Sequence, residues 1–82
     1  MKLEQEIRQH IVNEYLKGKE PDGFDNDYNL IDGGILDSLT IINLVNYLER
    51  TYTIQFGENE IVPEHLSSVM TLGNFVGRKL GK

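Results

Sequence analysis

The sequence predicts an all-α domain, a small four-helix bundle with a long loop between its first two helices and a short third helix. Apolar residues recur at helical spacing in the first, middle and last parts of the chain, and a stretch rich in Gly, Asp and Asn separates the first two of these. The 82 residues suffice for one domain, spanning residues 1–82, and 39% of them are hydrophobic, which is enough for a core and too many for a disordered chain.

The first helix is expected at about residues 3–17, with Gly18 as its stop and Pro21 shortly after it. Residues 18–37 then form the long loop. A long irregular segment inside a small domain is usually functional or is held in place by its own apolar residues. Six apolar residues of the loop can hold it: Phe24, Tyr28, Leu30, Ile31, Ile35 and Leu36.

The second helix is expected at about residues 38–52 and starts at Asp37 or Ser38. Its core stripe follows the spacing i, i+3, i+4, i+7 and i+11 and comprises Ile41, Leu44, Val45, Leu48 and Tyr52. Ile42 lies about 100° around the helix from Ile41 and therefore off this stripe. We expect Leu44 and Leu48 in the core and Ile42 outside it.

The last part of the chain predicts two more helices. A turn at residues 53–60 anchors Ile54 and Phe56, and a short third helix follows at about residues 61–67 with Pro63 in its first turn. Thr71 is expected to cap the fourth helix, at about residues 71–81. Its inward residues are Leu72, Phe75, Val76 and Leu80.

Acidic residues are concentrated in the centre of the chain. Residues 20–65 hold ten acids and one base, Arg50, whereas the whole chain has a net charge of −5. Because a nucleic-acid-binding domain needs a basic stripe, neither nucleic acid nor anionic lipid is expected as a partner. The acids suit partners with basic docking patches, or they simply keep a small protein in solution.

Other classes of protein are also disfavoured. The chain has no cysteine, so it has no disulfide framework and no thiolate site. Its apolar runs are far shorter than a membrane span, and its first residues lack the apolar region of a signal peptide. We therefore expect a cytoplasmic monomer that does not associate with membranes.

No metal site or catalytic site is expected. Asp25, Asp27 and Asn29 match positions 1, 3 and 5 of a calcium-binding loop, but leucine stands where that loop needs its glycine and its bidentate glutamate. His10 and His65 belong to separate helices, and we interpret both as surface residues. No base is expected near Ser38, and no strand precedes Gly33-Gly34 as in a phosphate-binding loop, so the protein is not expected to be an enzyme.

With metal and catalytic sites disfavoured, one segment is left as a candidate functional site: Gly33-Gly34-Ile35-Leu36-Asp37-Ser38-Leu39. Ordinary helix capping explains one of its two polar residues, because Asp and Ser are both favoured N-caps. A serine at an exposed helix start is also chemically useful, since the helix N-terminus stabilises a phosphodiester placed there. Asp37 can interact with a cation or with a basic group of a modifying enzyme.

Part of this segment, Gly34-Ile35-Leu36-Asp37-Ser38-Leu39, resembles the G-x-x-D-S-L attachment motif of acyl carrier and peptidyl carrier proteins. The resemblance covers nearly the whole chain. Three further segments are similar to the family's region between its second and last helices: Ile54-Gln55-Phe56, Ile61-Val62-Pro63-Glu64-His65-Leu66 and Thr71-Leu72-Gly73-Asn74-Phe75. The chain is thus identified as a free-standing member of the phosphopantetheine-binding carrier family.

The resemblance implies a function and a set of site residues. Ser38 would receive 4′-phosphopantetheine from coenzyme A through a phosphopantetheinyl transferase. The thiol of this arm would hold an acyl or aminoacyl group as a thioester and present it to loading and transfer enzymes. Tethering would raise the effective concentration of the cargo to roughly millimolar. Asp37, Leu39, Ile42 and Asn46 match the positions where the family's second helix meets partner enzymes.

The chain departs from the carriers of fatty-acid synthesis, which usually have several acids along the second helix. Here Asn43 and Arg50 stand at such positions, which leaves Asp37 and Glu49. This favours a specialised polyketide, nonribosomal-peptide or aminoacyl pathway over a housekeeping carrier. Two alternatives of other classes stay open: an unmodified helical interaction module, in which Ser38 is dispensable, and a small calcium-responsive domain.

Overall fold

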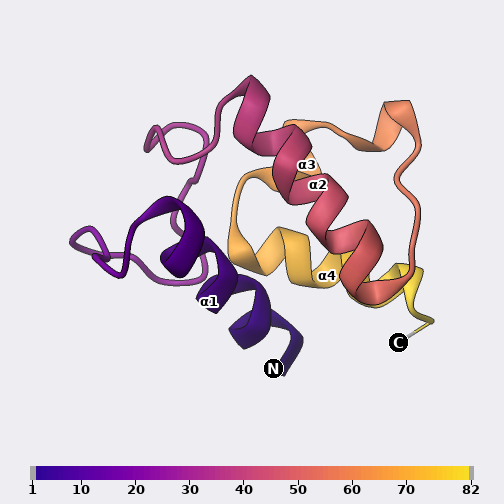
Figure 1. The fold of residues 1–82 in the computed structure, drawn as a ribbon, viewed down its shortest axis with the longest axis horizontal. Coiled ribbons are helices and arrows are strands. Elements are labelled where there is room, and N and C mark those ends of the chain that lie inside the picture. Colours follow the sequence, from indigo (N-terminus) through magenta and orange to yellow (C-terminus); the bar gives the residue numbers. More distant parts are fainter. Residues whose placement is uncertain (1, 82) are drawn as a thin grey trace.

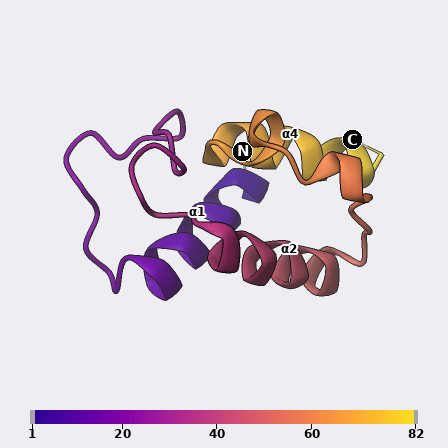
Figure 2. The ribbon, with the colours of Figure 1, turned by 90° about the horizontal axis from the view of Figure 1, so that it is seen from above.

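The computed structural model describes residues 2–81. Over that range the chain folds into α1 (Lys2–Tyr15), α2 (Ser38–Tyr52), a 3-10 turn η1 (Glu58–Glu60), α3 (Pro63–Leu66) and α4 (Val69–Lys79), with no strand among the described residues. Figure 1 shows α2 in front of α4, with the loop after α1 extending to one side. Figure 2, turned by 90°, shows α2 and α4 on opposite sides of the molecule. The predicted all-α fold is confirmed.

The core lies where α1, α2 and α4 face one another. Ile7 and Ile11 of α1, Leu44 and Leu48 of α2 and Leu72 of α4 are all 0% exposed. The predicted stripe of α2 faces this core: Val45 is also buried, and Ile41 and Tyr52 are half-buried against it. The apolar spacing of the sequence therefore predicted the helix register correctly.

Helix α1 packs against α4, and Gly73 of α4 lies in this contact. A Cβ atom added to Gly73 would lie 2.6 Å from Cγ of Glu4, a distance that real contacts do not reach. The Glu4 side chain therefore packs directly on the backbone of α4 at Gly73, where a larger residue would displace it. Gly73 therefore makes room for the Glu4 side chain between α1 and α4.

The helix ends differ in detail from the sequence expectations. Residues 16–18 follow α1 as a turn in which the Gly18 N–H donates to the carbonyl of Val12 at 3.0 Å, and Gly18 has a φ of +81°. The expectation that Thr71 caps the last helix is wrong, because α4 begins two residues earlier and Ser68 is its N-cap. Thr71 is instead the other half of a capping box: its N–H donates to Ser68 Oγ, and its Oγ1 accepts from the Ser68 N–H, both at 3.1 Å.

Residues 18–37 form a loop that is held by Arg8, by the carbonyl of Ser67 and by the Met70 N–H, which donates to the carbonyl of Asn26 at 2.9 Å. Arg8 of α1 donates to the Phe24 carbonyl at 2.6 Å and to Asn26 Oδ1 at 3.2 Å, forms an ion pair with Glu20 at 2.9 Å, and lies over the Phe24 ring. Farther along, the N–H of Leu30 donates to the carbonyl of Ser67 at 2.6 Å. The predicted anchoring by apolar residues is confirmed. Three of the six are buried in the core: Phe24, Leu30 and Leu36. The other three are half-buried against it: Tyr28, Ile31 and Ile35.

Asp37 is the N-cap of α2, and Ser38 is its first helical residue. The Asp37 carboxylate accepts from the N–H groups of Leu39 and Thr40 at 3.1 and 2.9 Å and from the Thr40 hydroxyl at 3.0 Å. Thr40 Oγ1 in turn accepts from the Asp37 N–H at 2.6 Å, which completes a capping box. These hydrogen bonds lower the pKa of Asp37 because they stabilise its ionised form, and the bonds from Thr40 have the largest effect.

The helix register predicts unequal effects of three alanine substitutions in α2. Leu44→Ala and Leu48→Ala should each lower the free energy of unfolding by about 2–5 kcal/mol, because each opens a cavity at a fully buried position. Ile42→Ala should cost far less, since the Ile42 side chain is 55% exposed. Thermal denaturation of the three variants measures the difference, and equal losses of melting temperature would contradict the register.

The cap of α2 predicts a pH dependence of stability. The folded pKa of Asp37 lies below its unfolded value, so the cap stabilises the fold fully above about pH 5 and loses this effect as the pH falls through about 4 and below. Asp37→Asn keeps a side-chain oxygen that can cap the helix but does not titrate. Urea denaturation between about pH 7 and pH 3 should show wild type losing more stability on acidification than Asp37→Asn. Parallel pH profiles for the two proteins would exclude this role.

Candidate functional site

Ser38 is the exposed first residue of α2, the helix that begins where the long loop ends (Figure 1). Because Asp37 satisfies the N–H groups of Leu39 and Thr40, the serine hydroxyl is not needed as a cap. Within residues 2–81 no hydrogen bond to the Ser38 side chain is found. Ser38 therefore combines an exposed hydroxyl with a backbone that the neighbouring residues hold in place.

The environment of Ser38 suits attachment of a phosphodiester. The Ser38 N–H lies in the first turn of α2, at the positive end of the helix dipole, where backbone N–H groups favour an anion. The ionised Asp37 carboxylate is adjacent, but it is directed at its own helix through three hydrogen bonds. The residues present thus accommodate a phosphate group on the serine oxygen.

Two glycines before Ser38 have different structural roles. Gly34 has a φ of +79°, a conformation that side-chain-bearing residues rarely adopt. Gly33 lies under the ring of Tyr28, where an added Cβ would approach Tyr28 Cε1 to 2.6 Å and the Asn29 carbonyl to 2.9 Å. The turn before Ser38 therefore has no room for a side chain at position 33 and needs a left-handed backbone at position 34.

The structure places the four expected docking residues around this site, and all four are exposed. Leu39 and Ile42 are 68% and 55% exposed, which is high for large apolar side chains. Leu39, Ile42 and Asn46 lie at helical spacing on the outward side of α2, opposite the core stripe. Asp37 lies at the end of this face, but its carboxylate is also the helix cap, so any role in docking is combined with a structural one.

The interpretation of both histidines as surface residues is wrong. Each is half-buried and packed against an aromatic ring: His10 stacks on Tyr47 with centroids 3.5 Å apart, and His65 packs on Phe75 at 4.3 Å. Burial is the main cause that lowers the pKa of His10, and the carboxylate of Glu14 opposes it. Both rings serve packing between elements, and neither residue is adjacent to Ser38 in sequence.

The calcium-like residues of the long loop are used within the loop itself. Asp25 Oδ1 accepts from the Asp27 N–H at 3.0 Å, and Asn29 Oδ1 accepts from the N–H groups of Ile31 and Asp32 at 3.0 and 2.8 Å. These are turns stabilised by side chains. The described part of the chain contains no group of three or more His, Cys, Asp or Glu residues that could hold a metal ion.

Concave surface in the described structure lies elsewhere. A groove of about 600 Å³ runs between the start of α1 and α4, with Leu3, His65, Gly73 and Gly77 among its lining residues, and Ser38 does not border it. None of the described helices is both long and apolar enough to cross a bilayer. Ser38 thus lies on exposed surface at the start of α2, beside the exposed side chains of Leu39 and Ile42.

Comparison with known proteins agrees with this geometry. No protein-family model matches the chain. The probable acyl carrier protein PigG of Serratia sp. (strain ATCC 39006) is 33% identical over 76 residues, which are 93% of this chain and 86% of PigG. A chain of a crystal structure described as an FAD-dependent dehydrogenase is 34% identical, with a TM-score of 0.75 over 85% of this chain and 97% of that chain. With a curated relative of this identity aligned over most of both sequences, the chain belongs to the acyl carrier protein family.

Proposed function

We propose that Ser38 carries 4′-phosphopantetheine and that the protein delivers an acyl or aminoacyl group, held as a thioester, to partner enzymes. The observation that carries this proposal is the exposed, unbonded hydroxyl of Ser38 at the first position of α2, directly after the capping residue Asp37. The match of Gly34–Leu39 to the family's attachment motif supports it. An unmodified interaction module would have no use for a free hydroxyl at this place.

The arm supplies the reactive thiol, which this cysteine-free chain lacks. The chain's own residues hold the attachment point. Asp37 and Thr40 fix the first turn of α2, and Gly33 and Gly34 bring the loop to it. A rigid attachment point with a flexible arm keeps the cargo near the docking face at high effective concentration. The protein itself performs no chemical step in this scheme.

We further propose a specialised pathway in which one partner is an FAD-dependent dehydrogenase. The similar chain from the dehydrogenase crystal structure is aligned over 97% of its length, so it is about as long as this one. An all-helical chain of this size cannot contain the α/β sheet of a typical dinucleotide-binding domain. This supports an arrangement in which a carrier chain accompanies a dehydrogenase that oxidises the tethered cargo and reduces its flavin.

The proposed function predicts that Ser38 is the sole attachment site. Wild-type protein incubated with coenzyme A, magnesium and a broad-range phosphopantetheinyl transferase should gain the mass of one phosphopantetheine. Ser38→Ala should gain none. Because Asp37 rather than Ser38 is the N-cap, Ser38→Ala should keep the helical circular dichroism spectrum of wild type. Intact-mass spectrometry checks the loading, and labelling that persists in Ser38→Ala would refute the assignment.

The proposed docking face predicts that Ile42→Ala should slow loading by the cognate enzyme more than Asp37→Asn does. Burial of an exposed isoleucine in a complex contributes roughly 1.5–3 kcal/mol. An exposed ion pair typically contributes less than about 1 kcal/mol and is weakened by salt. Loading rates of the two variants, measured at low and high salt, make the comparison.

The choice of substitution keeps folding and docking separate. Asn at position 37 retains a capping oxygen, so a change in loading reports the lost charge and not a frayed helix. If Ile42→Ala loads at the wild-type rate, or if wild-type loading collapses at high salt, then recognition is electrostatic and the proposed apolar docking is refuted.

A further inference from the structure

The ring of Tyr28 covers the turn that leads to Ser38. A Cβ atom added to Gly33 would lie 2.6 Å from Tyr28 Cε1 and 2.8 Å from the Tyr28 hydroxyl oxygen, so the ring occupies the space that a side chain at position 33 would fill. The next residue, Gly34, is also a glycine, and glycine has the greatest backbone freedom of all residues. A turn with two adjacent glycines therefore depends on contacts from its surroundings to keep one shape.

Tyr28 is itself held from α1 through a second ring. Its ring packs on the Phe24 ring with centroids 5.3 Å apart and planes tilted by 58°, which is a favourable arrangement for two aromatic side chains. Phe24 is buried, and the guanidinium carbon of Arg8 lies over its ring, 4.8 Å from the centroid. Arg8 also donates to the Phe24 carbonyl at 2.6 Å. A continuous series of contacts therefore runs from α1 through two rings to the backbone of Gly33.

The backbone connects this turn to the serine. The N–H groups of Ile35 and Leu36 donate to the Leu30 carbonyl at 2.9 and 3.0 Å. These two bonds form only while residues 31–34 keep the conformation that brings the ends of the turn together. Leu36 is buried, and Asp37, the cap of α2, is the only residue between it and Ser38. The shape of the turn therefore bears on the position of the serine.

We propose that Tyr28 is a positioning residue for the attachment of phosphopantetheine: its ring keeps the turn at Gly33 in the shape that presents Ser38. The inference rests on the proposed function of Ser38. Without the ring, the turn samples more shapes, and a smaller fraction of the molecules presents the serine correctly. Because a modifying enzyme binds only this fraction, the KM for the carrier rises while kcat stays the same. The Tyr28 hydroxyl forms no hydrogen bond in the described part of the chain, so the aromatic ring is sufficient for this role.

A ring that only fills the core makes a different prediction. Tyr28 is half-buried against the core, so its loss also removes apolar contacts from the domain as a whole. Global destabilisation raises the hydrogen exchange of every protected amide, including that of Leu48 within α2, whereas local loosening is confined to the turn and the cap. The amides of Leu39 and Thr40 report on the cap, because both donate to Asp37 Oδ1.

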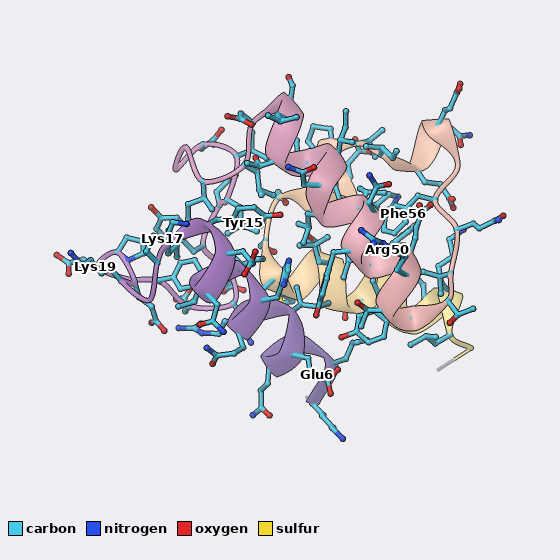
Figure 3. The ribbon with its side chains drawn as sticks, viewed as in Figure 1. Glu6, Tyr15, Lys17, Lys19, Arg50 and Phe56 are labelled. Carbon is cyan, nitrogen blue, oxygen red and sulfur yellow. The ribbon has the colours of Figure 1, made fainter. Side chains whose placement is uncertain are left out.

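The test replaces Tyr28 by leucine, which is apolar but has no flat ring, and by phenylalanine, which keeps the ring. Tyr52→Leu is the matched control. Tyr52 is also a half-buried tyrosine packed against the core, but it lies at the other end of α2, about 21 Å along the helix axis from Ser38. Its hydroxyl donates to Glu6 at 2.8 Å, and Figure 3 shows Glu6 well away from the start of α2.

Two measurements are made on each variant. Amide exchange of the unmodified proteins, followed by NMR, should be about tenfold faster at Leu36 and Thr40 in Tyr28→Leu, with Leu48 changed less than about twofold. Loading rates with coenzyme A and a broad-range transferase, measured against carrier concentration, should give Tyr28→Leu a KM about three- to tenfold higher and a kcat within about twofold of wild type. Tyr28→Phe should match wild type in both measurements. Tyr52→Leu should change neither kinetic constant.

Equal changes of KM in Tyr28→Leu and Tyr52→Leu would overturn the proposal, as would exchange that rises equally at Thr40 and Leu48. If Tyr28→Leu does not fold, Arg8→Gln provides the second variant, because it leaves the Tyr28 ring in place but removes the support from α1. It should show the same selective exchange at the turn and the cap, and unchanged exchange there would also overturn the proposal. Absence of loading in wild type would refute the proposed function of Ser38, whereas the exchange rates decide separately whether the ring orders the start of α2.

Discussion

The anchoring of Leu30 is the constraint on which the rest of the structure depends. Its side chain is fully buried, its N–H donates to the Ser67 carbonyl at 2.6 Å, and its own carbonyl accepts from the N–H groups of Ile35 and Leu36 at 2.9 and 3.0 Å. One residue thus joins the loop to the segment before α4 and closes the turn that leads to Ser38. A loop of this length would otherwise leave the start of α2, and with it the proposed attachment residue Ser38, free to move.

The sequence predicted what depends on local spacing. The apolar stripe of α2 places Leu44 and Leu48 in the core and Ile42 outside it, because helical periodicity alone decides which side of a helix a residue occupies. Ser38 and its motif were also found from sequence, because a short contiguous segment carries that information. Whether Ser38 is modified stays a prediction.

Features that depend on tertiary contacts could not be predicted in this way. From the sequence, Arg8 would be taken for a solvent-exposed charge on the first helix. In the structure it donates a hydrogen bond to the carbonyl of Phe24, sixteen residues away. The need for glycine at position 33 arises from the Tyr28 ring that packs on it. Similarly, Ser68 and Thr71 are both acceptable caps by residue type. Only the geometry of the chain before α4 makes Ser68 the cap, with Thr71 as its partner in the box.

The two sides of α2 are under different constraints. On the inner side, folding alone explains the leucines at positions 44 and 48, since any polar residue there would be buried without a partner. On the outer side, folding gives no reason for Leu39 and Ile42, because their side chains remain mostly in water and add nothing to the core. Exposed apolar residues grouped on one face of a helix are typical of an interaction surface. The capping box at Asp37 allows one helix to satisfy both constraints: it frees Ser38 from a capping role and fixes the first turn of α2, so the outer face has a defined direction relative to the proposed attachment residue.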